Sequence, residues 1–281
     1  MTSALAPHDR WRPLVMGVVN VTPDSFSDGG RYLGAKAACD HALTLLDQGA
    51  DWLDIGGEST RPGAEPVSAD EEAERILPVI EAVLAVRPDA RISIDTMKPE
   101  VAGAAMRAGA ALWNDVTALS APGAAELAAK LGCHVCLMHM RGAPRTMQDA
   151  PVYDDVVTDV ARYLGQRAGA VMAAGVARER IVLDPGIGFG KTLAHNLALM
   201  AALEPYAGLG FPILFGASRK RFIAAIDPSA ADAGDRLGGS LAAALLAARA
   251  GAAMVRVHDV RETVQAITVQ AAILEAKDTG R

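Results

Sequence analysis

The sequence predicts a parallel β/α barrel, and three observations favour this fold class. Short runs rich in β-branched residues alternate with longer segments rich in Ala and Leu, which is typical of βαβ units and a parallel sheet. The alternation reaches eight units in 281 residues, a length that suits one α/β barrel. Strand after strand ends in a polar side chain, as expected at the catalytic face of a barrel. We therefore expect an α/β fold, a (β/α)8 TIM barrel, as a single domain over residues 1–281, with the barrel proper over about 14–277.

The eight expected strands follow one another along the chain, and helices fill most of the gaps between them. They are Val15–Asn20, Trp52–Gly56, Arg91–Asp95, Ala111–Asp115, His134–His139, Ile181–Asp184, Pro212–Gly216 and Met254–His258. No repeat of fixed period and no linker-like segment divides the sequence into two halves. A doubly wound open sheet shares the alternation and remains the alternative, although eight evenly spread units favour closure.

Three connections are long and rich in turn-forming residues: Val21 to Gly34, Gly57 to Ser68, and Met138 to Val152. Each follows a strand, so all three are expected on one face. In a barrel this is the catalytic face.

Charge and hydropathy exclude two classes of partner. The chain has 27 Lys and Arg against 33 Asp and Glu, a formal charge of −6, and no block of like charges, so nucleic acid is not an expected partner. Charges or glycines interrupt every apolar stretch before about 18 residues, so no segment is expected to span a membrane. Residues Met1 to Pro13 lack the apolar core of a signal peptide, and we expect a cytoplasmic protein with a short lead-in.

The cysteines also favour a reducing compartment. There are three, Cys39, Cys133 and Cys136, and an odd number in a chain of this size argues against a disulfide framework. Cys133 and Cys136 match C-x-x-C, but three steps along a strand place the two sulfurs on opposite faces. We interpret them as structural.

The main indication of chemistry is the set of polar residues at strand ends: Asn20, Asp95, Asn114 with Asp115, Asp184, and Arg256 with His258. A turn or helix cap would explain any one of them, but it explains the whole set poorly. Arg256 and His258 are two apart and share one face of the last strand, so they present positive charge together. This pair suits a phosphate or diphosphate.

Two segments after strands also suggest ligand binding. After the seventh strand, a helix N-terminus is expected within Ala217–Arg221, with backbone N–H groups directed at an anion. Asp184–Thr192 imitates a nucleotide-binding loop, but Pro185 occupies a glycine position and its glycines are spaced G-x-G-x-G. These glycines are better explained by close approach of the backbone to a flat ligand.

Clusters of His and Cys with metal-ligand spacing are absent from the sequence. Any metal should therefore be a hard cation. The side-chain oxygen of Asn20 together with a substrate diphosphate is the sparse set of ligands that Mg²⁺ accepts while it keeps several waters.

The segment Met16–Gly30, with Asn20 followed by Val-Thr-Pro-Asp-Ser-Phe-Ser-Asp-Gly-Gly, closely resembles the dihydropteroate synthases of folate biosynthesis. Further motifs of that family follow in order: Asp54–Gly63 (DIGGESTRPG), Ser93–Thr96, Asn114-Asp115, Leu137–Met140, Asp184–Gly186, Ser218–Lys220 and Arg256–Val260. The resemblance covers about Val15 to Val260. It implies a (β/α)8 barrel that joins (7,8-dihydropterin-6-yl)methyl diphosphate to 4-aminobenzoate, forming 7,8-dihydropteroate and diphosphate.

The resemblance also implies roles for individual residues. The pterin would be held by Asp95, Asn114, Met138, Asp184, Phe189 and Lys220, and the diphosphate by Asn20, Arg256 and His258 with Mg²⁺. The aminobenzoate would contact Phe26, Thr60, Arg61, Pro62, Phe189, Ser218 and Arg221. The residues implied in catalysis are Asn20, Asp24, Asp28, Lys220, Arg256 and His258, with C–O cleavage preceding attack by the arylamine.

One departure from the family pattern concerns the aminobenzoate carboxylate. Some members have Ser directly after the lysine of the S-R-K motif, where this chain has Arg221. Ser218, helix N–H groups or Arg221 itself would then bind the carboxylate. The resemblance further implies a homodimer and competitive inhibition by sulfonamides.

Two other functions are compatible with the same barrel. A pterin-dependent methyltransferase could share Asp95, Asn114 and Asp184, but it has no need for Arg256 and His258. A catalytically silent pterin-binding paralogue would lack motifs that are intact here. An assay for diphosphate release separates these alternatives.

Overall fold

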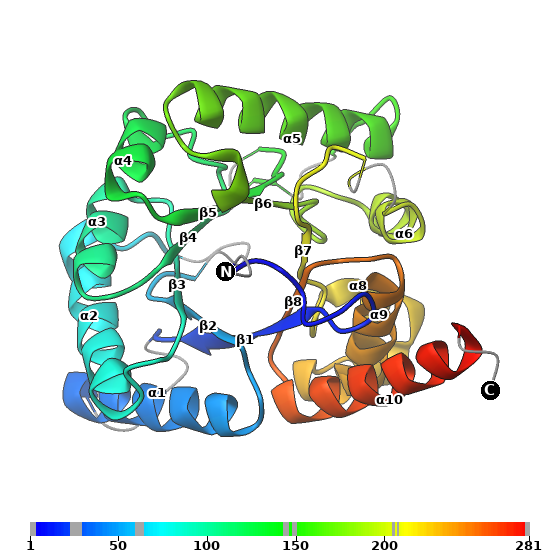
Figure 1. Cartoon of the computed structure of the whole chain (residues 1–281), viewed down its shortest axis with the longest axis horizontal. Coiled ribbons are helices and arrows are strands. Elements are labelled where there is room, and N and C mark those ends of the chain that lie inside the picture. The colour runs from blue at the N-terminus through cyan, green and yellow to red at the C-terminus, as the bar shows by residue number, and fades with distance from the viewer. Residues whose placement is uncertain are drawn as a thin grey trace.

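Eight parallel strands form one sheet that curves into a barrel in the computed structural model, and helices surround it (Figure 1). The structure describes residues 4–22, 30–59, 65–142, 146–147, 151–203, 206 and 208–278, and of residues 30–33 and 278 only the backbone. The strands are β1 (Leu14–Asn20), β2 (Trp52–Gly56), β3 (Ile92–Asp95), β4 (Leu112–Asp115), β5 (His134–Met138), β6 (Ile181–Asp184), β7 (Leu214–Phe215) and β8 (Met254–Val257).

The barrel is closed by the two strands at the ends of the sheet. The strand order is β6-β5-β4-β3-β2-β1-β8-β7, so each strand lies beside its neighbours in the sequence. Leu183 and Ile213 form a parallel bridge between β6 and the start of β7, and the Leu183 amide donates to the Pro212 carbonyl at 2.9 Å. The TIM barrel is therefore confirmed. The open-sheet alternative is excluded, because a doubly wound sheet reverses its strand order at a switch point.

Seven of the eight strands begin and end within one residue of the predicted bounds. The exception is β7, which is only two residues long, whereas Pro212–Gly216 was expected. Pro212 has no N–H to donate, and Ile213 forms an isolated bridge with Leu183 while its carbonyl accepts from the Ala253 and Met254 amides at 2.9 and 3.1 Å. The chain therefore passes between β6 and β8 at this point with few of the regular hydrogen bonds of a parallel ladder.

The helices alternate with the strands, as the sequence predicts. They are α1 (Gly30–Asp47), α2 (Ala69–Val86), α3 (Pro99–Arg107), α4 (Ala124–Leu131), α5 (Val156–Ala173), α6 (Leu193–Ala201), α8 (Arg221–Ile226), α9 (Leu237–Arg249) and α10 (Val260–Asp278), with short 3-10 turns at Arg178–Arg180, Pro228–Ala230 and Ala233–Arg236.

The first long connection is shorter than predicted, because α1 begins at Gly30 and not after Gly34. Glycine lowers helix stability by only about 1 kcal/mol. Burial of Ala38, Ala42 and Leu45 further along the helix outweighs that cost. The second connection ends where it was predicted to end, with Ser68 as the N-cap of α2.

The core has two layers because successive side chains along each strand point alternately out of and into the barrel. Outward residues pack against the helices, and inward residues form a smaller cluster inside the barrel. That inner cluster consists of Leu5, Leu14, Met16, Trp52, Leu112, Cys136, Val182, Leu214 and Met254. Its member Leu5 comes from the N-terminal segment, which crosses the centre of the ring in Figure 1. This end of the barrel is therefore packed with apolar side chains.

The C-x-x-C cysteines have the predicted arrangement. Cys136 belongs to the inner cluster and Cys133 to the outer one, and both are free thiols. Burial raises the pKa of Cys133 to about 11, which leaves it unreactive at neutral pH.

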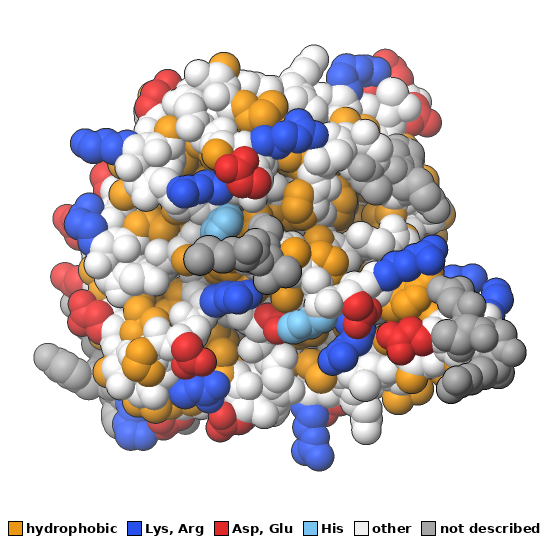
Figure 2. Space-filling view, in the orientation of Figure 1, with side chains coloured by type: hydrophobic (Ala, Val, Ile, Leu, Met, Phe, Trp, Pro, Cys, Tyr) orange, Lys and Arg blue, Asp and Glu red, His pale blue; other side chains and the backbone are white. Residues whose placement is uncertain are grey.

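Basic and acidic side chains are interspersed on the face of the molecule shown in Figure 2. Within the described part of the chain, no helix combines the length and the apolar character needed to cross a membrane.

Candidate active site at the carboxyl ends of the strands

Polar side chains lie inside the barrel directly above its apolar layer. The register explains this, because inward positions recur every second residue. Asp54 follows Trp52 by two residues, Asn114 follows Leu112, and the same spacing places Asp184 above Val182 and Arg256 above Met254. One end of the barrel is therefore apolar and the other polar.

Arg256 is the centre of this polar layer. Its Nε donates to Asp54 Oδ2 at 2.5 Å, and its second terminal nitrogen donates to Asp95 Oδ2 at 2.8 Å. Asp54 is fully buried and accepts two further hydrogen bonds, from Ser93 Oγ at 2.5 Å and from Asn114 Nδ2 at 3.0 Å. Side chains from four strands are thus linked by hydrogen bonds to one guanidinium and two carboxylates.

The charges of this cluster affect one another. Burial opposes the charge on Arg256, but the carboxylates of Asp54 and Asp95 outweigh it and raise the pKa of the guanidinium. Burial and the charge of Asp54 raise the pKa of Asp95 to about 7, although Arg256 acts in the opposite direction. Asp95 can therefore gain or lose a proton near neutral pH, while Arg256 stays charged.

A second group lies near Arg256 at the barrel mouth, since only β7 separates β8 from β6. Asp184 accepts a hydrogen bond from the Gly186 amide at 2.7 Å, and burial raises the pKa of its carboxyl. Lys220 Nζ donates to the Ile187 carbonyl and lies 4.7 Å from the centre of the Phe189 ring. Burial lowers the pKa of Lys220 to about 8. A carboxylate, a cation and an aromatic face thus border one space.

Gly216 keeps that space open. A Cβ at this position would lie 3.7 Å from Arg256 Cβ and 3.9 Å from Asp184 Oδ2. A longer side chain would therefore enter the gap between the guanidinium and the carboxylate.

Ser218 and His258 contact each other at the mouth. Ser218 Oγ accepts from the His258 amide at 3.2 Å and lies 3.1 Å from His258 Nδ1. Between β7 and α8, Arg219 adopts a left-handed backbone with φ of 57°, and its amide donates to Ser240 Oγ at 2.9 Å. Its guanidinium forms a two-pronged pair with Asp259. These contacts fix the residues on either side of Arg219.

The expected helix N-terminus within Ala217–Arg221 is confirmed, at the end of that range. Ser218 and Arg219 form a turn, and α8 begins at Arg221, with Lys220 as its N-cap. The ion pair of Arg219 with Asp259 holds this turn ahead of the helix.

The glycine-rich turn after β6 packs tightly on the end of β5. Gly186 has φ of 69°, and a Cβ there would lie 1.9 Å from the His139 carbonyl oxygen. Beneath the turn, Lys191 is almost fully buried and its Nζ contacts His139 Nδ1 at 2.9 Å, the Gly186 carbonyl at 2.9 Å and the Phe189 carbonyl at 3.0 Å. The turn that carries Phe189 is thus held in one position.

Gly186→Ala should lower the free energy of unfolding by about 3 kcal/mol, from left-handed strain of about 1–2 kcal/mol and overpacking of about 1–3 kcal/mol. The matched control is Gly238→Ala, since Gly238 lies in α9 where a Cβ meets open space. That change should stabilise by about 0.5–1 kcal/mol. Urea denaturation measures the free energy of unfolding of both variants. Equal values for Gly186→Ala and Gly238→Ala would contradict this prediction.

The structure brings several predicted residues together and separates others. Those that border the polar layer described above are Asp95, Asn114, Asp184, Phe189, Lys220 and Arg256. Met138 is buried at the end of β5 near Gly186, and Asn20 is half-buried at the end of β1. Arg221 is exposed at the start of α8. Six predicted residues lie outside the described part of the chain: Asp24, Phe26, Asp28, Thr60, Arg61 and Pro62.

The prediction that Asp115 belongs with the polar strand ends of the candidate site is wrong. It is one residue beyond the inward Asn114, so it faces outward. Its carboxylate accepts from the amides of Thr117 at 2.7 Å and Leu119 at 2.9 Å. Asp115 is therefore the turn cap that the simpler explanation proposed.

Asp54 was the main residue that strand-end reasoning missed. It lies in the middle of β2, two residues before the end, and yet it contacts three polar side chains of the site. The signal was present in the sequence: one charge within the apolar run Trp52–Gly56. A buried charge inside a strand needs a partner, which indicates a site.

The residues present are compatible with Mg²⁺ only if the ion arrives with a substrate. Within the described part of the chain, no group of three or more His, Cys, Asp or Glu side chains could hold a metal. The carboxylates of Asp54 and Asp95 already form ion pairs with the guanidinium of Arg256. Asn20, half-exposed at the mouth, is the neutral oxygen ligand that fits a diphosphate-bound, largely hydrated ion.

Comparison with known proteins agrees with this geometry. Residues 16–258 match the family model described as pterin binding enzyme. The chain is 49% identical over 276 residues to the dihydropteroate synthase of Escherichia coli strain K12, covering 97% of this chain and 96% of that protein.

Solved structures of similar proteins share the fold. The dihydropteroate synthase of Xanthomonas albilineans in complex with 7,8-dihydropteroate is 47% identical, with a TM-score of 0.85 and coverage of 95% of each chain. A Yersinia pestis dihydropteroate synthase with a sulfonamide drug complex is 48% identical, with a TM-score of 0.89 and coverage of 95% of this chain and 96% of that one. This chain belongs to the family of pterin-binding enzymes and, within it, to the dihydropteroate synthases.

Proposed function

We propose that this chain joins (7,8-dihydropterin-6-yl)methyl diphosphate to 4-aminobenzoate, releasing diphosphate and forming 7,8-dihydropteroate. The observation that carries the proposal is the buried polar layer in which Arg256 and Lys220 alternate with Asp95 and Asp184. A layer of this kind suits a flat heterocycle with several N–H donors and an anionic leaving group. The similarity to dihydropteroate synthases over nearly the whole chain supports the same reaction.

In this proposal the pterin lies between Asp184 and the group formed by Asn114 and Asp95. A carboxylate accepts two parallel hydrogen bonds from an amino-pyrimidine edge, which is the role of Asp184. Lys220 and Phe189 cover one face of the ring, consistent with the contact of the ammonium with the Phe189 ring. Met138 lines the pocket from β5.

The diphosphate is bound by Asn20, Arg256 and His258. Charged donors directed at the leaving oxygen stabilise the charge that develops there as the C–O bond breaks. Mg²⁺, when bound with the diphosphate, would neutralise further charge on the leaving group. The contact of Ser218 with His258 orients the imidazole.

The neutral arylamine then attacks the pterin methylene carbon, and the protonated nitrogen that results loses its proton to solvent or to the released diphosphate, so the protein needs no strong base. We propose that Phe26, Thr60, Arg61 and Pro62 contact the aminobenzoate, with Phe189 as the shared wall and Ser218 or Arg221 near its carboxylate. Asp24 and Asp28 would stabilise the pterin cation. Exclusion of water by these segments would protect the cation from hydrolysis.

The assay that tests the proposal supplies the purified protein with the pterin diphosphate, 4-aminobenzoate and Mg²⁺ and measures dihydropteroate and diphosphate. Both products should form in equal amounts. Formation of neither product at saturating substrates would refute the proposal. Sulfonamides should compete with 4-aminobenzoate; competition with the pterin diphosphate would contradict the assignment of the aminobenzoate site.

The pKa of Asp95 predicts how pterin affinity changes with pH. Its value of about 7 lies well above that of an unfolded aspartate, so the free protein protonates Asp95 as pH falls below about 7. Only the ionised carboxylate of Asp95 accepts two N–H donors with its two oxygens. Below about pH 7, pterin binding must therefore displace the proton from Asp95. The affinity for 6-hydroxymethylpterin, which has no phosphate to titrate, should fall by about tenfold per pH unit below about 7.

Calorimetry between pH 5.5 and 8 measures this dependence. Asp95→Asn, which cannot titrate, should bind more weakly at pH 8 and show no slope. A slope of equal size in Asp95→Asn would assign the titration to another group.

Two wider expectations belong to the same proposal. A homodimer would cover apolar side chains that are exposed on α9 and α10, namely Leu246, Val269 and Ile273. Light scattering of the purified chain tests whether it is a dimer.

The second expectation is a cytoplasmic location, with which the three buried free cysteines are consistent.

A further inference from the structure

Lys191 is a buried lysine whose ammonium contacts only uncharged groups within the described part of the chain. It is 3% exposed and lies beneath the glycine-rich turn that follows β6. Its Nζ donates to the carbonyl oxygens of Gly186 at 2.9 Å, Phe189 at 3.0 Å and His139 at 3.3 Å, and it lies 2.9 Å from His139 Nδ1. Burial, together with the charge of Lys191, lowers the pKa of His139 to about 3, so this imidazole is neutral. All four partners are therefore uncharged acceptors.

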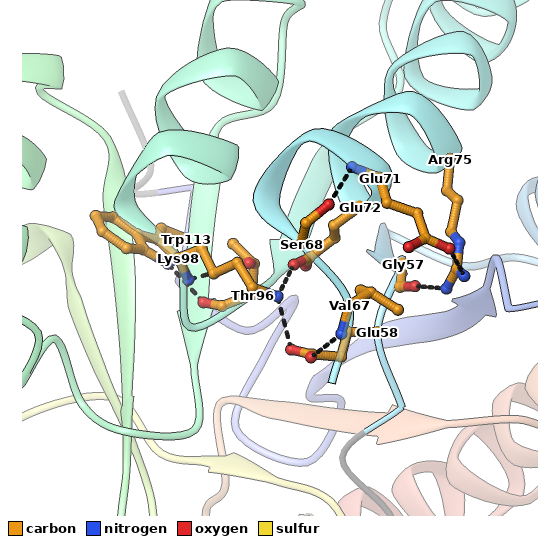
Figure 3. Close-up of polar contacts among 10 residues, drawn as sticks. All are labelled: Gly57, Glu58, Val67, Ser68, Glu71, Glu72, Arg75, Thr96, Lys98 and Trp113. Carbon is orange, nitrogen blue, oxygen red and sulfur yellow. Dashed lines mark hydrogen bonds and ion pairs between the residues drawn. The ribbon is translucent and has the colours of Figure 1, made fainter. Parts of the chain in front are cut away.

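Lys98 shows the more usual way in which a protein stabilises an ammonium away from solvent (Figure 3). Its Nζ lies 2.6 Å from Glu72 Oε2 and 3.0 Å from Glu58 Oε2. Burial acts against the charge on Lys98, but the two glutamates outweigh burial and raise its pKa. At Lys191, burial outweighs the opposing effect of Asp184 and lowers the pKa to about 7. Pairing of charges therefore does not explain why a lysine occupies position 191.

The ammonium of Lys191 joins two segments at the carboxyl ends of β5 and β6. Gly186 and Phe189 belong to the turn after β6, and His139 directly follows β5. An ammonium offers three N–H donors from one atom, and carbonyl oxygens that lie close together away from solvent need such donors. An apolar side chain of the same length would leave these oxygens without this donor. Lys191 thus holds the backbone of the turn against the end of β5.

The turn in its observed position makes three contacts with the residues proposed to hold the pterin. The Gly186 amide donates to Asp184 Oδ1 at 2.7 Å. The Ile187 carbonyl accepts from Lys220 Nζ, and the centre of the Phe189 ring lies 4.7 Å from the same nitrogen. The backbone of the turn therefore sets the position of a carboxylate, an ammonium and an aromatic ring of the proposed pocket.

Two other side chains also hold this turn, at different residues. The Gly188 amide donates to Asn196 Oδ1 at 2.7 Å, and the Tyr153 hydroxyl donates to the Gly190 carbonyl at 2.8 Å. These contacts lie at the middle and at the end of the turn, and they remain when the lysine is replaced. The turn should then stay folded and gain freedom at the residues that the ammonium holds.

We propose that Lys191 is a positioning residue for the pterin. Its ammonium gathers the carbonyls of Gly186, Phe189 and His139, and so directs the Gly186 amide at Asp184 and the Phe189 ring at the pterin. It acts through the backbone of the turn and needs no contact of its own with the substrate. This inference rests on the proposed function, because it assigns the role of the lysine in binding that substrate.

Lys191→Met tests the proposal, since it removes the ammonium and keeps most of the length. The Kd for 6-hydroxymethylpterin, measured by calorimetry, should rise about tenfold, the equivalent of one hydrogen bond of the site. The kcat at saturating substrates should fall by less than about threefold, because the contacts of Arg256 do not involve the turn. A purely structural lysine would not produce this selective loss of affinity.

Ile80→Ala is the control for loss of stability. Ile80 is fully buried in α2, which packs on α1, α3 and β2. Both substitutions should lower the urea concentration at the midpoint of unfolding, Ile80→Ala by leaving a cavity and Lys191→Met by leaving carbonyls without a donor. Ile80→Ala should nevertheless keep the Kd for 6-hydroxymethylpterin within about twofold of the wild-type value.

Lys191→Gln provides the second variant. It keeps two N–H donors on a shorter side chain, so its Kd should lie between those of the wild type and Lys191→Met. If Lys191→Met does not fold, Lys191→Gln by itself should raise the Kd about threefold.

Three results would overturn the inference: a folded Lys191 variant with unchanged Kd, an equal rise in Kd for Ile80→Ala, or a fall in kcat with no change in Kd. Failure of the proposed function would appear separately, as absence of dihydropteroate when the wild-type protein is supplied with both substrates.

Discussion

Arg256→Ala should reduce turnover by about 10³-fold, as expected when a main donor to the leaving group is removed. It should also lower the free energy of unfolding by about 3–5 kcal/mol, since Asp54 and Asp95 would be left as buried carboxylates without their cation. The role with the diphosphate assigned to Arg256 from the sequence accounts only for the first effect. The second follows from the two ion pairs that the guanidinium makes.

Single-turnover kinetics and urea denaturation measure the two effects separately. Arg249→Ala is the control, because Arg249 is exposed in the last turn of α9 and should affect neither. Adding Asp54→Asn to Arg256→Ala should recover part of the stability, by removing one unpaired charge, and none of the turnover. Recovery of turnover in the double variant would mean that Arg256 acts only on Asp54.

Asp184→Asn should weaken pterin binding by about 100-fold, the equivalent of about 3 kcal/mol for a buried charge-assisted pair of hydrogen bonds. An amide of the same shape offers one acceptor where the carboxylate offers two. Its remaining oxygen can still accept the Gly186 amide, so the turn should keep its position. The fold should therefore survive the change.

Calorimetry with 6-hydroxymethylpterin measures that affinity. Asp40→Asn serves as the control, because Asp40 lies on α1 and contacts only the exposed Lys36 among charged side chains of the described chain. Unchanged pterin affinity in Asp184→Asn would assign the pterin to another part of the barrel.

The barrel and most of the candidate residues could be predicted because their signals are local. A period of two along each strand and a polar residue at its end are visible in ten residues of sequence, and seven strands lie within one residue of their predicted bounds. The same local logic failed at Asp115, because polarity marks a strand end without stating which face the side chain occupies. It failed at Asp54 because attention to strand ends overlooks a charge within a strand.

By itself, the sequence determined the order of eight strands, the face that carries the chemistry and the residue types available there. Only the tertiary structure decided the partners: Arg256 pairs with Asp54 and Asp95, which precede it by 202 and 161 residues, and Lys98 joins two glutamates from different elements. The physical reason is that the choice of partner depends on the register of strands around the barrel. Closure of the barrel brings distant positions together, and no local sequence pattern encodes which positions meet.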